Sequence, residues 1–349
     1  MQKINKWIHD KVNSIKDYYN NSSKISIIKT IKNNNYIHFI LKLKDGRIIF
    51  SQNGRNLNIL EPSNDYKISL SFQADKWHVT CLCEISENII AASGGEQSIK
   101  IWDLHNNSYK LLHTIYSVDC CSHTNIVLLS NKRLLYASIS NVKIWKWKDN
   151  YIFNLIKVIQ VEHCNAPGFL ECLLYIDYKD IALFGKEESL QIWNMKDIQL
   201  ITTIQGVGCF SRNSMSLIDK ARVVVGGRNG ICIININTME IEDRLNYENI
   251  FVLCCIRISE DSIICGRLEG RMLLYNMRSH EYCIIRGIHN KDCSVIIKLE
   301  DNLYMSAHQK IRIWKYNMIK NKINILIKTN KYCIIYINYF QLKSPLSIF

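Results

Sequence analysis

Cysteine is the residue type of this sequence with the greatest capacity for chemistry, because thiolates bind zinc and take part in redox reactions. The 349 residues include 14 cysteines. Zinc sites commonly use paired CxxC motifs, whereas the closest cysteines here are adjacent or one residue apart: Cys81 and Cys83, Cys120 and Cys121, Cys254 and Cys255. They recur in short apolar stretches, where a buried thiol packs as a small apolar side chain. We therefore predict a packing role, with no metal and no cofactor.

Other candidate catalytic groups are equally isolated. The acidic pair Glu187-Glu188 is expected in a turn, where carboxylates are normally solvated. The segment GGRNG (226–230) lacks the lysine and the following helix that a phosphate-binding loop needs. The ten histidines show no HxH or HxxxH spacing. We predict that the protein is not an enzyme and has no small-molecule substrate, although a site assembled from unrelated loops would leave no sequence pattern.

The composition indicates a folded chain with free thiols. It is 48% hydrophobic and contains only 3 Pro and 14 Gly, so no Pro/Gly-rich linker divides it. The first twelve residues, MQKINKWIHDKV, contain no apolar stretch typical of a secretory signal. No apolar run approaches the roughly 18 residues of a membrane-spanning helix. We expect a cytoplasmic protein whose cysteines are reduced.

The net charge of +13 is concentrated at the two ends of the chain. Residues 1–35 carry seven Lys against two Asp, and residues 315–349 carry six Lys and no acid. These ends account for +5 and +6, which leaves +2 for the 279 residues between them. Basic ends are suited to nonspecific contact with nucleic acid. With no RNA-binding motif and a nearly neutral body, we predict no specific nucleic-acid partner.

A short apolar segment that ends in a large residue recurs through the chain. The spacing between the last residues of successive copies is 42, 43, 48, 41, 41 and 39. The seven copies are LNIL (57–60), IKIW (99–102), VKIW (142–145), LQIW (190–193), ICII (231–234), MLLY (272–275) and IRIW (311–314). The sequence is therefore built of seven units of about forty residues each.

A second apolar marker, usually containing Cys, precedes this segment in each unit. Its copies are IHFI (37–40), VTCL (79–82), VDCC (118–121), LECL (170–173), VGCF (207–210), VLCC (252–255) and CSVI (293–296). Two further apolar stretches complete each unit, and no helix-length amphipathic segment intervenes. Each unit thus reads as four short strands, with the second marker on the strand nearest the centre. Because one such sheet cannot cover both of its faces, we predict an all-β, seven-bladed β-propeller of four-stranded antiparallel blades.

These repeats resemble the WD-repeat family over about residues 25–328. The best match is SGGEQSIKIWD (93–103), and four tryptophans share the position on the third strand: Trp102, Trp145, Trp193 and Trp314. No Gly-His dipeptide is present, RGIHNKD (286–292) being the nearest approach. Glu96, Glu187 and Glu269 replace the family's turn aspartate in three units. Because that aspartate belongs to a polar network with His, Ser/Thr and Trp, its loss predicts a propeller held mainly by apolar packing.

Closure of the ring requires an outer strand for the last blade. ISIIKTI (25–31) precedes the first blade at the distance expected of such a strand, so we expect it to pair with blade seven. INILIKT (323–329) competes for the same place, or forms a hairpin with YCIIYINYF (332–340). We divide the chain into a basic N-terminal segment (1–23), the propeller (24–329) and a β-prone tail (330–349).

The resemblance implies a non-catalytic scaffold that binds other proteins or peptides through one loop face. Aromatic and arginine side chains favour such contacts. The loops entering the first strands and the turns between the second and third strands are expected on that face. The candidate partner-binding residues there are Tyr36, Arg55, His78, Phe169, Arg228, Phe251, Arg267 and Asp292. The alternative for Phe169 and Phe251 is that they cap the core.

The N-terminal segment suggests a second function. Ile4, Trp7, Ile8, Val12, Ile15 and Tyr19 follow a 3.6-residue period, and lysines occupy the rest of the cylinder. This pattern predicts a short basic amphipathic helix over residues 3–20. Such a helix could pack on the propeller, bind a partner, or lie on an anionic membrane surface. The alternative function is therefore a peripheral membrane adaptor.

Overall fold

The chain forms two compact units, residues 27–315 and the two chain ends taken together. The computed structural model describes residues 25–32, 35–52, 54–116, 125–138, 141–148, 151–160, 170–186, 188–209, 211–246, 251–285, 287–317, 325–330 and 332–337. The predicted helix over residues 3–20 lies outside this part of the chain. In the described part of the chain ends, β29 (Ile325–Asn330) and β30 (Tyr332–Ile337) pair as an antiparallel hairpin.

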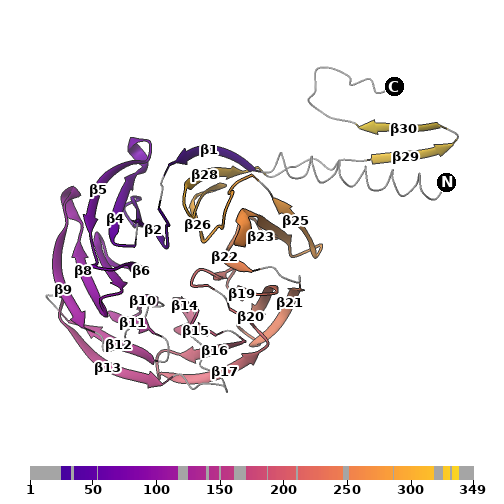
Figure 1. Cartoon of the computed structure of the whole chain (residues 1–349). Helices are drawn as coiled ribbons and strands as arrows, with labels where there is room; N and C mark the ends of the chain where they lie inside the picture. The colour runs from indigo at the N-terminus through magenta and orange to yellow at the C-terminus, as the bar shows by residue number, and fades with distance from the viewer. Residues whose placement is uncertain are drawn as a thin grey trace. The chain divides into compact units, whose positions relative to one another are not determined.

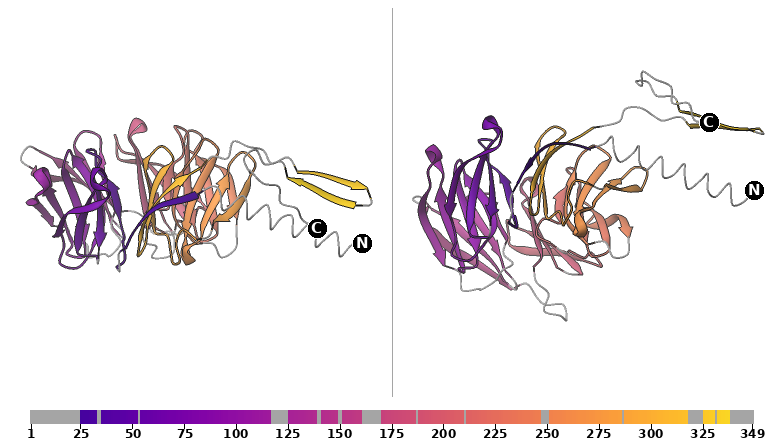
Figure 2. Two further views of the ribbon diagram at one scale, coloured as in Figure 1. Left: turned by 90° about the horizontal axis from the view of Figure 1, so that it is seen from above. Right: turned by 45° about the horizontal axis from the view of Figure 1, so that its top comes forward.

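Residues 25–316 form seven four-stranded antiparallel sheets arranged as the blades of a ring (Figure 1). Figure 2 shows the same blades from two further directions. The first strands are β2 (Ile40–Lys42), β6 (Val79–Ser86), β10 (Asn125–Leu129), β14 (Cys172–Ile176), β18 (Met215–Leu217), β22 (Val252–Arg257) and β26 (Val295–Glu300). The second strands are β3 (Ile48–Gln52), β7 (Ile89–Gly94), β11 (Arg133–Ala137), β15 (Ile181–Gly185), β19 (Arg222–Gly227), β23 (Ser262–Arg267) and β27 (Leu303–Ala307).

The outer half of each blade contains the repeat that defines the sequence. The third strands are β4 (Asn56–Glu61), β8 (Ser98–Asp103), β12 (Asn141–Trp147), β16 (Ser189–Asn194), β20 (Gly230–Asn235), β24 (Met272–Asn276) and β28 (Ile311–Tyr316). The outermost strands are β5 (Lys67–Gln73), β9 (Lys110–Tyr116), β13 (Phe153–Gln160), β17 (Gln199–Gln205), β21 (Glu240–Asn246), β25 (Glu281–Ile285) and, in blade seven, β1 (Ile25–Ile31). The described connections contain the single-turn 3-10 helices η1 (Pro62–Asn64), η2 (His105–Asn107), η4 (Asp177–Lys179) and η5 (Leu268–Gly270). The predicted seven-bladed propeller is confirmed.

The N-terminal strand of the propeller, β1, closes the ring. β1 lies beside β28 at the outer edge of blade seven, as predicted for residues 25–31. The competing segment near 323–329 does not take this place, because β29 pairs with β30 instead. The blade that contains the last repeat is therefore completed by the start of the described chain.

One of the predicted inner strands was placed wrongly. In blade five, the marker VGCF (207–210) precedes the first strand, which begins at Met215, so a longer connection separates the marker from the strand that pairs. In blade three, the first described strand begins at Asn125, and the marker VDCC (118–121) lies outside the described residues.

Apolar packing between neighbouring blades holds the ring together. The first strand of each blade contacts the first strand of the next, from β2 and β6 around to β26 and β2. Between blades four and five, for example, Leu190 and Ile192 share a buried cluster with Val223 and Val225. The tryptophans face the preceding blade: the rings of Trp102 and Phe72 lie 5.1 Å apart. Burial of both faces of every sheet explains why the large residue recurs while its neighbours vary.

The repeat also marks a point of irregular pairing. In five blades the register between the third and fourth strands shifts at the last residue of the repeat, Leu60, Trp102, Trp145, Trp193 or Ile234. At Trp102, for example, Ile101 pairs with His113 and Trp102 with Leu111, so the outer strand carries one extra residue. A β-bulge of this kind bends the strand and increases its twist. The large residue and the bulge therefore recur together.

One blade keeps a polar network of the type expected to be lost. Trp314 donates from Nε1 to the Ser306 hydroxyl at 2.9 Å, and His289 Nε2 lies 2.8 Å from the same oxygen. All three residues are buried. In contrast, Trp102 Nε1 is buried without a hydrogen bond. Trp193 Nε1 donates to Gln191 Oε1, on the same strand, at 3.1 Å. The prediction of a mainly apolar ring needs this correction at blade seven, where the segment RGIHNKD supplies the histidine.

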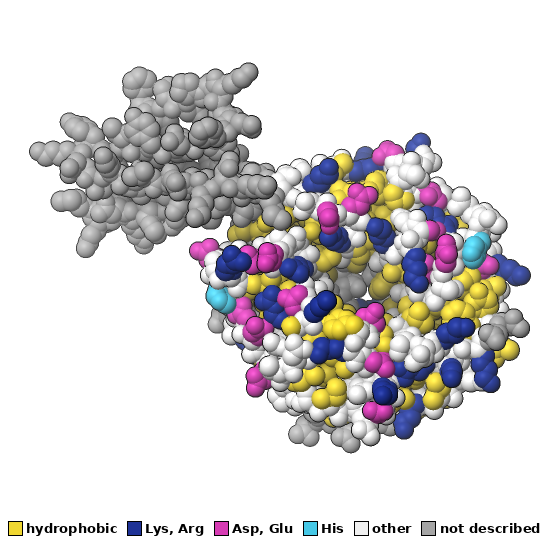
Figure 3. Space-filling view, turned by 180° about the vertical axis from the view of Figure 1, so that it is seen from behind, with side chains coloured by type: hydrophobic (Ala, Val, Ile, Leu, Met, Phe, Trp, Pro, Cys, Tyr) yellow, Lys and Arg dark blue, Asp and Glu magenta, His cyan; other side chains and the backbone are white. Residues whose placement is uncertain are grey.

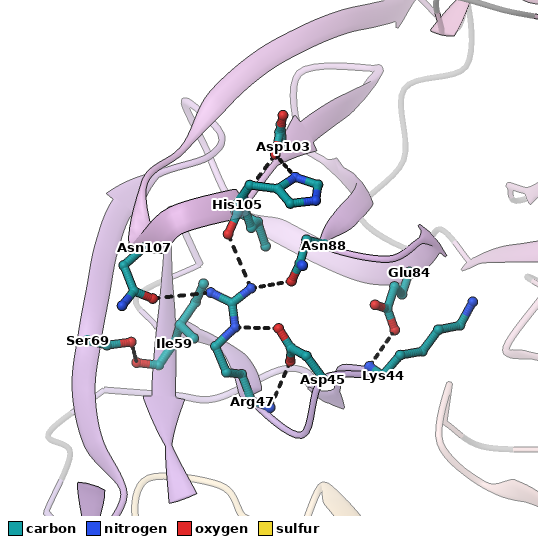
Figure 4. Close-up of polar contacts among 11 residues, drawn as sticks. Lys44, Asp45, Arg47, Ile59, Ser69, Glu84, Asn88, Asp103, His105 and Asn107 are labelled. Atoms are coloured by element: carbon teal, nitrogen blue, oxygen red, sulfur yellow. Dashed lines mark hydrogen bonds and ion pairs between the residues drawn. The ribbon is translucent and has the colours of Figure 1, made fainter. Parts of the chain in front are cut away.

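Arginines also tie blades together on the side of the ring that carries the first-to-second strand turns. Arg47 of blade one is held by Asp45 at 2.7 Å and bonds to Asn88 and to the Leu104 carbonyl (3.2 Å) of blade two (Figure 4). Arg133 of blade three reaches Met195 O at 2.5 Å and Asp180 at 3.3 Å in blade four. The same position at the start of the second strand thus bridges two pairs of blades.

Candidate functional site

Two sets of connections meet on one face of the propeller, which we call the loop face. It comprises the loops that enter the first strands and the turns that join the second and third strands. Backbone hydrogen bonds connect the two sets: Val79 to Gly54, Gly95 to His78, and Cys293 to Arg267. Further bonds of this kind join Cys209 to Lys186 and Ile37 to His308. The predicted convergence of these connections is observed.

The predicted partner-binding residues that the structure describes lie on this face but differ in exposure. Tyr36, Arg55 and Arg228 are exposed, whereas His78, Phe251 and Asp292 are half-buried. Arg267 is only 9% exposed, so its side chain offers little contact area. Phe169 lies outside the described residues. The assignment of these residues to a partner remains a prediction.

Several of these side chains support the face itself. The Tyr36 ring meets the His308 ring edge-on at 5.0 Å between centroids. Asp292 accepts a hydrogen bond of 2.9 Å from the Glu269 backbone N–H, which joins the loop entering blade seven to a turn of blade six. His78 lies beside Gly54 and Gly95, the close neighbours that its loop needs. Their positions are therefore set by contacts between blades.

The segment 211–214 crosses the mouth of the central channel. Arg212, in the loop that enters blade five, donates from its guanidinium to the Thr80 carbonyl of blade two at 2.8 Å. Asn213 donates from Nδ2 to the Ser294 carbonyl of blade seven at 3.0 Å and accepts at its own carbonyl from Cys255 N–H of blade six. Burial lowers the pKa of Arg212 from its usual value. One short loop thus ties together four blades around the axis.

Neutral imidazoles surround this crossing. Burial, followed by the charges of Arg212, His78 and His308, lowers the pKa of His38. Burial also lowers the pKa of His308, although Asp292 acts in the opposite direction. A buried guanidinium disfavours a second positive charge nearby. Burial and the Arg212 charge thus both disfavour protonation of His38.

Exposed aromatic side chains on the loop face were missed by sequence reasoning. Trp77 is 56% exposed, in the loop that enters blade two, with the Lys76 ammonium 6.0 Å from its ring centre. Tyr116 is 83% exposed at the end of β9, which reaches the same face. With Tyr36, 52% exposed, these aromatics flank blades one to three. A tryptophan outside the repeat position was the available signal.

The comparisons with known proteins found a partial likeness. No family model matches the sequence. The chain is 20% identical over 140 residues to the WD repeat-containing protein 55 homolog of Dictyostelium discoideum, which covers 40% of this chain and 34% of that protein. The chain is a seven-bladed β-propeller with similarity to this WD-repeat protein.

The match limits what can be transferred. The chain spans about a third of the length of its Dictyostelium relative, so the relative's activity and partners do not follow from the likeness. Propellers of the family are commonly protein-interaction scaffolds and usually non-catalytic. A fold alone does not determine a function. The function must therefore be inferred from the side chains of the loop face.

The loop face of the propeller contains a pocket between blades four and five. Its volume is about 290 Å³. The lining residues are Glu188, Gly206, Gly208, Val225, Gly227, Arg228, Asn229, Gly230, Ile231, Cys232, Arg244 and Asn246. It is thus formed by turns and strand ends, with Arg228 as the predicted site residue that it includes.

The described cysteines serve as packing residues. Cys81, Cys172, Cys209, Cys254 and Cys293 are all buried. A hydrogen bond with Cys172, together with burial, raises the pKa of Cys209, and burial raises the pKa of Cys83 to about 12. Such thiols are poor nucleophiles at neutral pH. Among the residues that the structure describes, no group of three or more His, Cys, Asp or Glu side chains could hold a metal ion.

The charge distribution on the ring is mixed. Figure 3 shows one face of the propeller, hollowed at its centre, with Lys and Arg side chains interspersed among Asp, Glu and apolar ones. No helix in the described ranges is long and apolar enough to span a membrane. The amphipathic segment 3–20, on which the membrane alternative depends, lies outside these ranges. That alternative stays a prediction from the sequence, testable by liposome sedimentation with and without residues 1–20.

Proposed function

We propose that this WD-repeat propeller is a non-catalytic scaffold that binds partner proteins or peptides through its loop face. The observation that carries the proposal is the set of exposed aromatics Tyr36, Trp77 and Tyr116 on the loop face of blades one and two. Aromatic side chains bury much area at little entropic cost and are enriched where binding energy is concentrated. Monomeric proteins seldom expose several together without such a use.

The stiffness of this face also favours recognition over turnover. The loops are joined by backbone hydrogen bonds between blades, and Arg212 and Asn213 connect four blades at the axis. A face held in this way loses little conformational entropy when a partner binds. Preorganisation of this kind supports affinity for a partner of matching shape.

The proposal includes a cytoplasmic location. It is supported by the described cysteines, which are thiols rather than disulfides, as is usual in the reducing cytosol. A fluorescent fusion to the full chain should be diffuse in the cytoplasm, and enrichment in an organelle would contradict this part of the proposal.

The test is affinity capture with a triple variant, Y36A/W77A/Y116A. These side chains are exposed, so the variant should fold, and its unfolding in urea should match that of the wild type within about 1 kcal/mol. We expect it to lose most partners that wild-type protein captures from lysate, as identified by mass spectrometry.

The matched control is Y178A, which removes an exposed tyrosine from the opposite side of the ring. Partners should persist with this variant. If the triple variant and the control retain the same set of partners as the wild type, the loop face is not the binding surface and the proposal fails.

A further inference from the structure

The pocket between blades four and five differs from the rest of the loop face in its chemistry. Its walls come from the turn between β19 and β20, the end of β21, and the connection that enters blade five. Val225, Ile231 and Cys232 form its inner part, where all three residues are buried. The hollow is therefore bounded by apolar side chains below and by polar groups at the rim.

Two arginines contribute the positive charge of this rim. Arg228 is exposed in the turn between β19 and β20, and Arg244 is exposed on β21 opposite Cys232. Within the part of the chain that the structure describes, the Arg244 guanidinium makes no hydrogen bond or ion pair. Its charge acts on Cys232, whose pKa burial raises and Arg244 lowers. Glu188 is the single acidic residue among the lining residues that the structure describes.

Glycines keep the pocket open. A Cβ atom on Gly227 would lie 2.3 Å from the Gly208 carbonyl oxygen, so no side chain fits at this junction. A Cβ atom on Gly206 would lie 3.7 Å from an Arg244 guanidinium nitrogen, which places that nitrogen beside bare backbone. Gly206 N–H itself is bonded to the Glu188 carbonyl at 2.8 Å. The geometry leaves a cavity of side-chain size next to the guanidinium.

We propose that this pocket binds a carboxylate or phosphate group presented by an acidic peptide segment of a partner. Guanidinium groups bind both oxyanions through paired, charge-assisted hydrogen bonds. Among the described lining residues, two arginines and Glu188 give a net charge of +1, which favours one anionic group. The inference rests on the proposed function, because the peptide is a segment of a protein held on the loop face. It adds an anionic anchor to the aromatic contacts.

A peptide is favoured over nucleic acid as the source of this group. The propeller body carries a charge of only +2, and acidic and basic side chains are mixed on the ring (Figure 3). Nucleic-acid backbones require a basic track that neutralises several phosphates in succession. Two arginines at the rim of one pocket instead suit a single acidic side chain.

The experiment measures fluorescence anisotropy of the full chain with three labelled pools of degenerate heptapeptides. The central residue is fixed as Glu, phosphoserine or Gln. At low salt, the wild type should bind the Glu or the phosphoserine pool at least about tenfold more tightly than the Gln pool, which corresponds to about 1.4 kcal/mol. The stronger of the two anionic pools then identifies the group as carboxylate or phosphate. Binding of neither, or equal binding of the Gln pool, overturns the inference.

Variants separate the pocket from the general charge of the face. R228Q/R244Q should abolish the preference for the anionic pool. The matched control R271Q/K310Q removes the same charge from two other exposed residues in turns of the loop face and should retain the preference. E188Q should tighten binding about two- to fivefold, a gain that a damaged fold cannot produce. Equal loss in both double variants, or no change with E188Q, contradicts the inference.

The result is distinguishable from failure of the proposed function. If Y36A/W77A/Y116A loses captured partners while R228Q/R244Q keeps the wild-type response to every pool, the pocket inference alone falls. If the triple variant keeps all its partners, the proposed function falls whatever the peptide pools show.

Discussion

Arg212 in the loop entering blade five donates a 2.8 Å hydrogen bond to the carbonyl oxygen of Thr80 in blade two, 132 residues earlier in the chain. The two blades are three positions apart in a ring of seven, so this bond crosses the central channel. Asn213 adds bonds to blades six and seven. The mouth of the channel is thus braced from within by one loop.

The first prediction concerns this brace. R212M should lower the free energy of unfolding by about 1–3 kcal/mol, because it leaves the buried Thr80 carbonyl without this donor. Urea denaturation of the purified chain measures the change. R271M, at an exposed arginine of the same face, should be nearly neutral. An R212M protein as stable as the wild type would mean that the cost of burying the guanidinium cancels its hydrogen bond.

A second prediction concerns the bridge between blades one and two. Arg47 is buried and bonds to Asp45, Asn88 and the Leu104 carbonyl (Figure 4). R47M should cost about 2–4 kcal/mol in urea unfolding, because Asp45 then loses its partner and the Leu104 carbonyl its donor. R47K keeps the charge without the planar fork, so it should lie between R47M and the wild type. An R47K protein as stable as the wild type, or more stable, would exclude a role for the planar geometry of the guanidinium.

The third prediction concerns the indole Nε1 atoms of Trp314 and Trp102. Trp314 Nε1 donates to Ser306, whereas Trp102 Nε1 is buried without a hydrogen bond. Both substitutions to Phe remove similar apolar area, but W314F also breaks a buried hydrogen bond. W314F should therefore be more destabilising than W102F by about 1 kcal/mol. Thermal or urea unfolding of the two variants side by side decides this, and an equal loss would show that packing dominates both sites.

The fourth prediction is a pH dependence. Burial, with the nearby charges of Arg312 and His308, lowers the pKa of His289 to about 3. The Ser306 hydroxyl accepts from Trp314 and is left to donate to neutral His289. An unfolded histidine has a pKa of about 6.5, so between these values the unfolded chain binds a proton that the folded chain does not. The stabilisation is complete above about pH 6.5 and declines as the pH falls toward 3.

Between pH 7.5 and 5.5, this single group should cost the wild type about 1.4 kcal/mol of unfolding free energy. H289Q removes the titrating group, so its loss over the same interval should be smaller by that amount. Urea titrations at both pH values measure it. Parallel pH dependence in the two proteins would assign the effect to other groups.

Ring closure supplies the fifth prediction. Deletion of residues 1–31 removes β1 and exposes the edge of β28, so the protein should lose several kcal/mol of stability and tend to aggregate. Deletion of residues 318–349 removes the β29–β30 hairpin, and the melting temperature should change little. Calorimetry of the two truncated proteins tests this. Greater damage from the C-terminal deletion would reverse the assignment of the closing strand.

The repeat could be recognised in the sequence because packing between blades requires a large residue at the same position of each unit. A large residue every forty or so positions, at Trp102, Trp145 and their equivalents, fixes the number of blades and the identity of the third strands. Ring closure by residues 25–31 followed from counting strands. The spacing of apolar residues predicted the start of a strand less reliably where the preceding connection is long, as before Met215. An apolar segment in a loop has the same sequence pattern as a strand.

The site depends on contacts that no local pattern encodes. Arg212 reaches Thr80 only because the loop before β18 is long enough to enter the channel. The pocket arises where the turn of blade five faces Gly206 and Gly208 of the preceding connection. Arg244 lies on an outer strand, where an arginine is ordinary in sequence. Such features follow from the curvature of the ring, which sets distances between residues far apart in the chain.

The pairing of β1 with β28 also orders events during synthesis. Translation makes β1 first and β28 nearly last, so the final sheet cannot form until almost the whole propeller has left the ribosome. The middle blades can pack one after another as they emerge, while the first strand waits with an unpaired edge. During elongation the unpaired edge of β1 is therefore exposed to pairing with other strands. The ring gains the stability of closure in a single late step, when β1 pairs with β28.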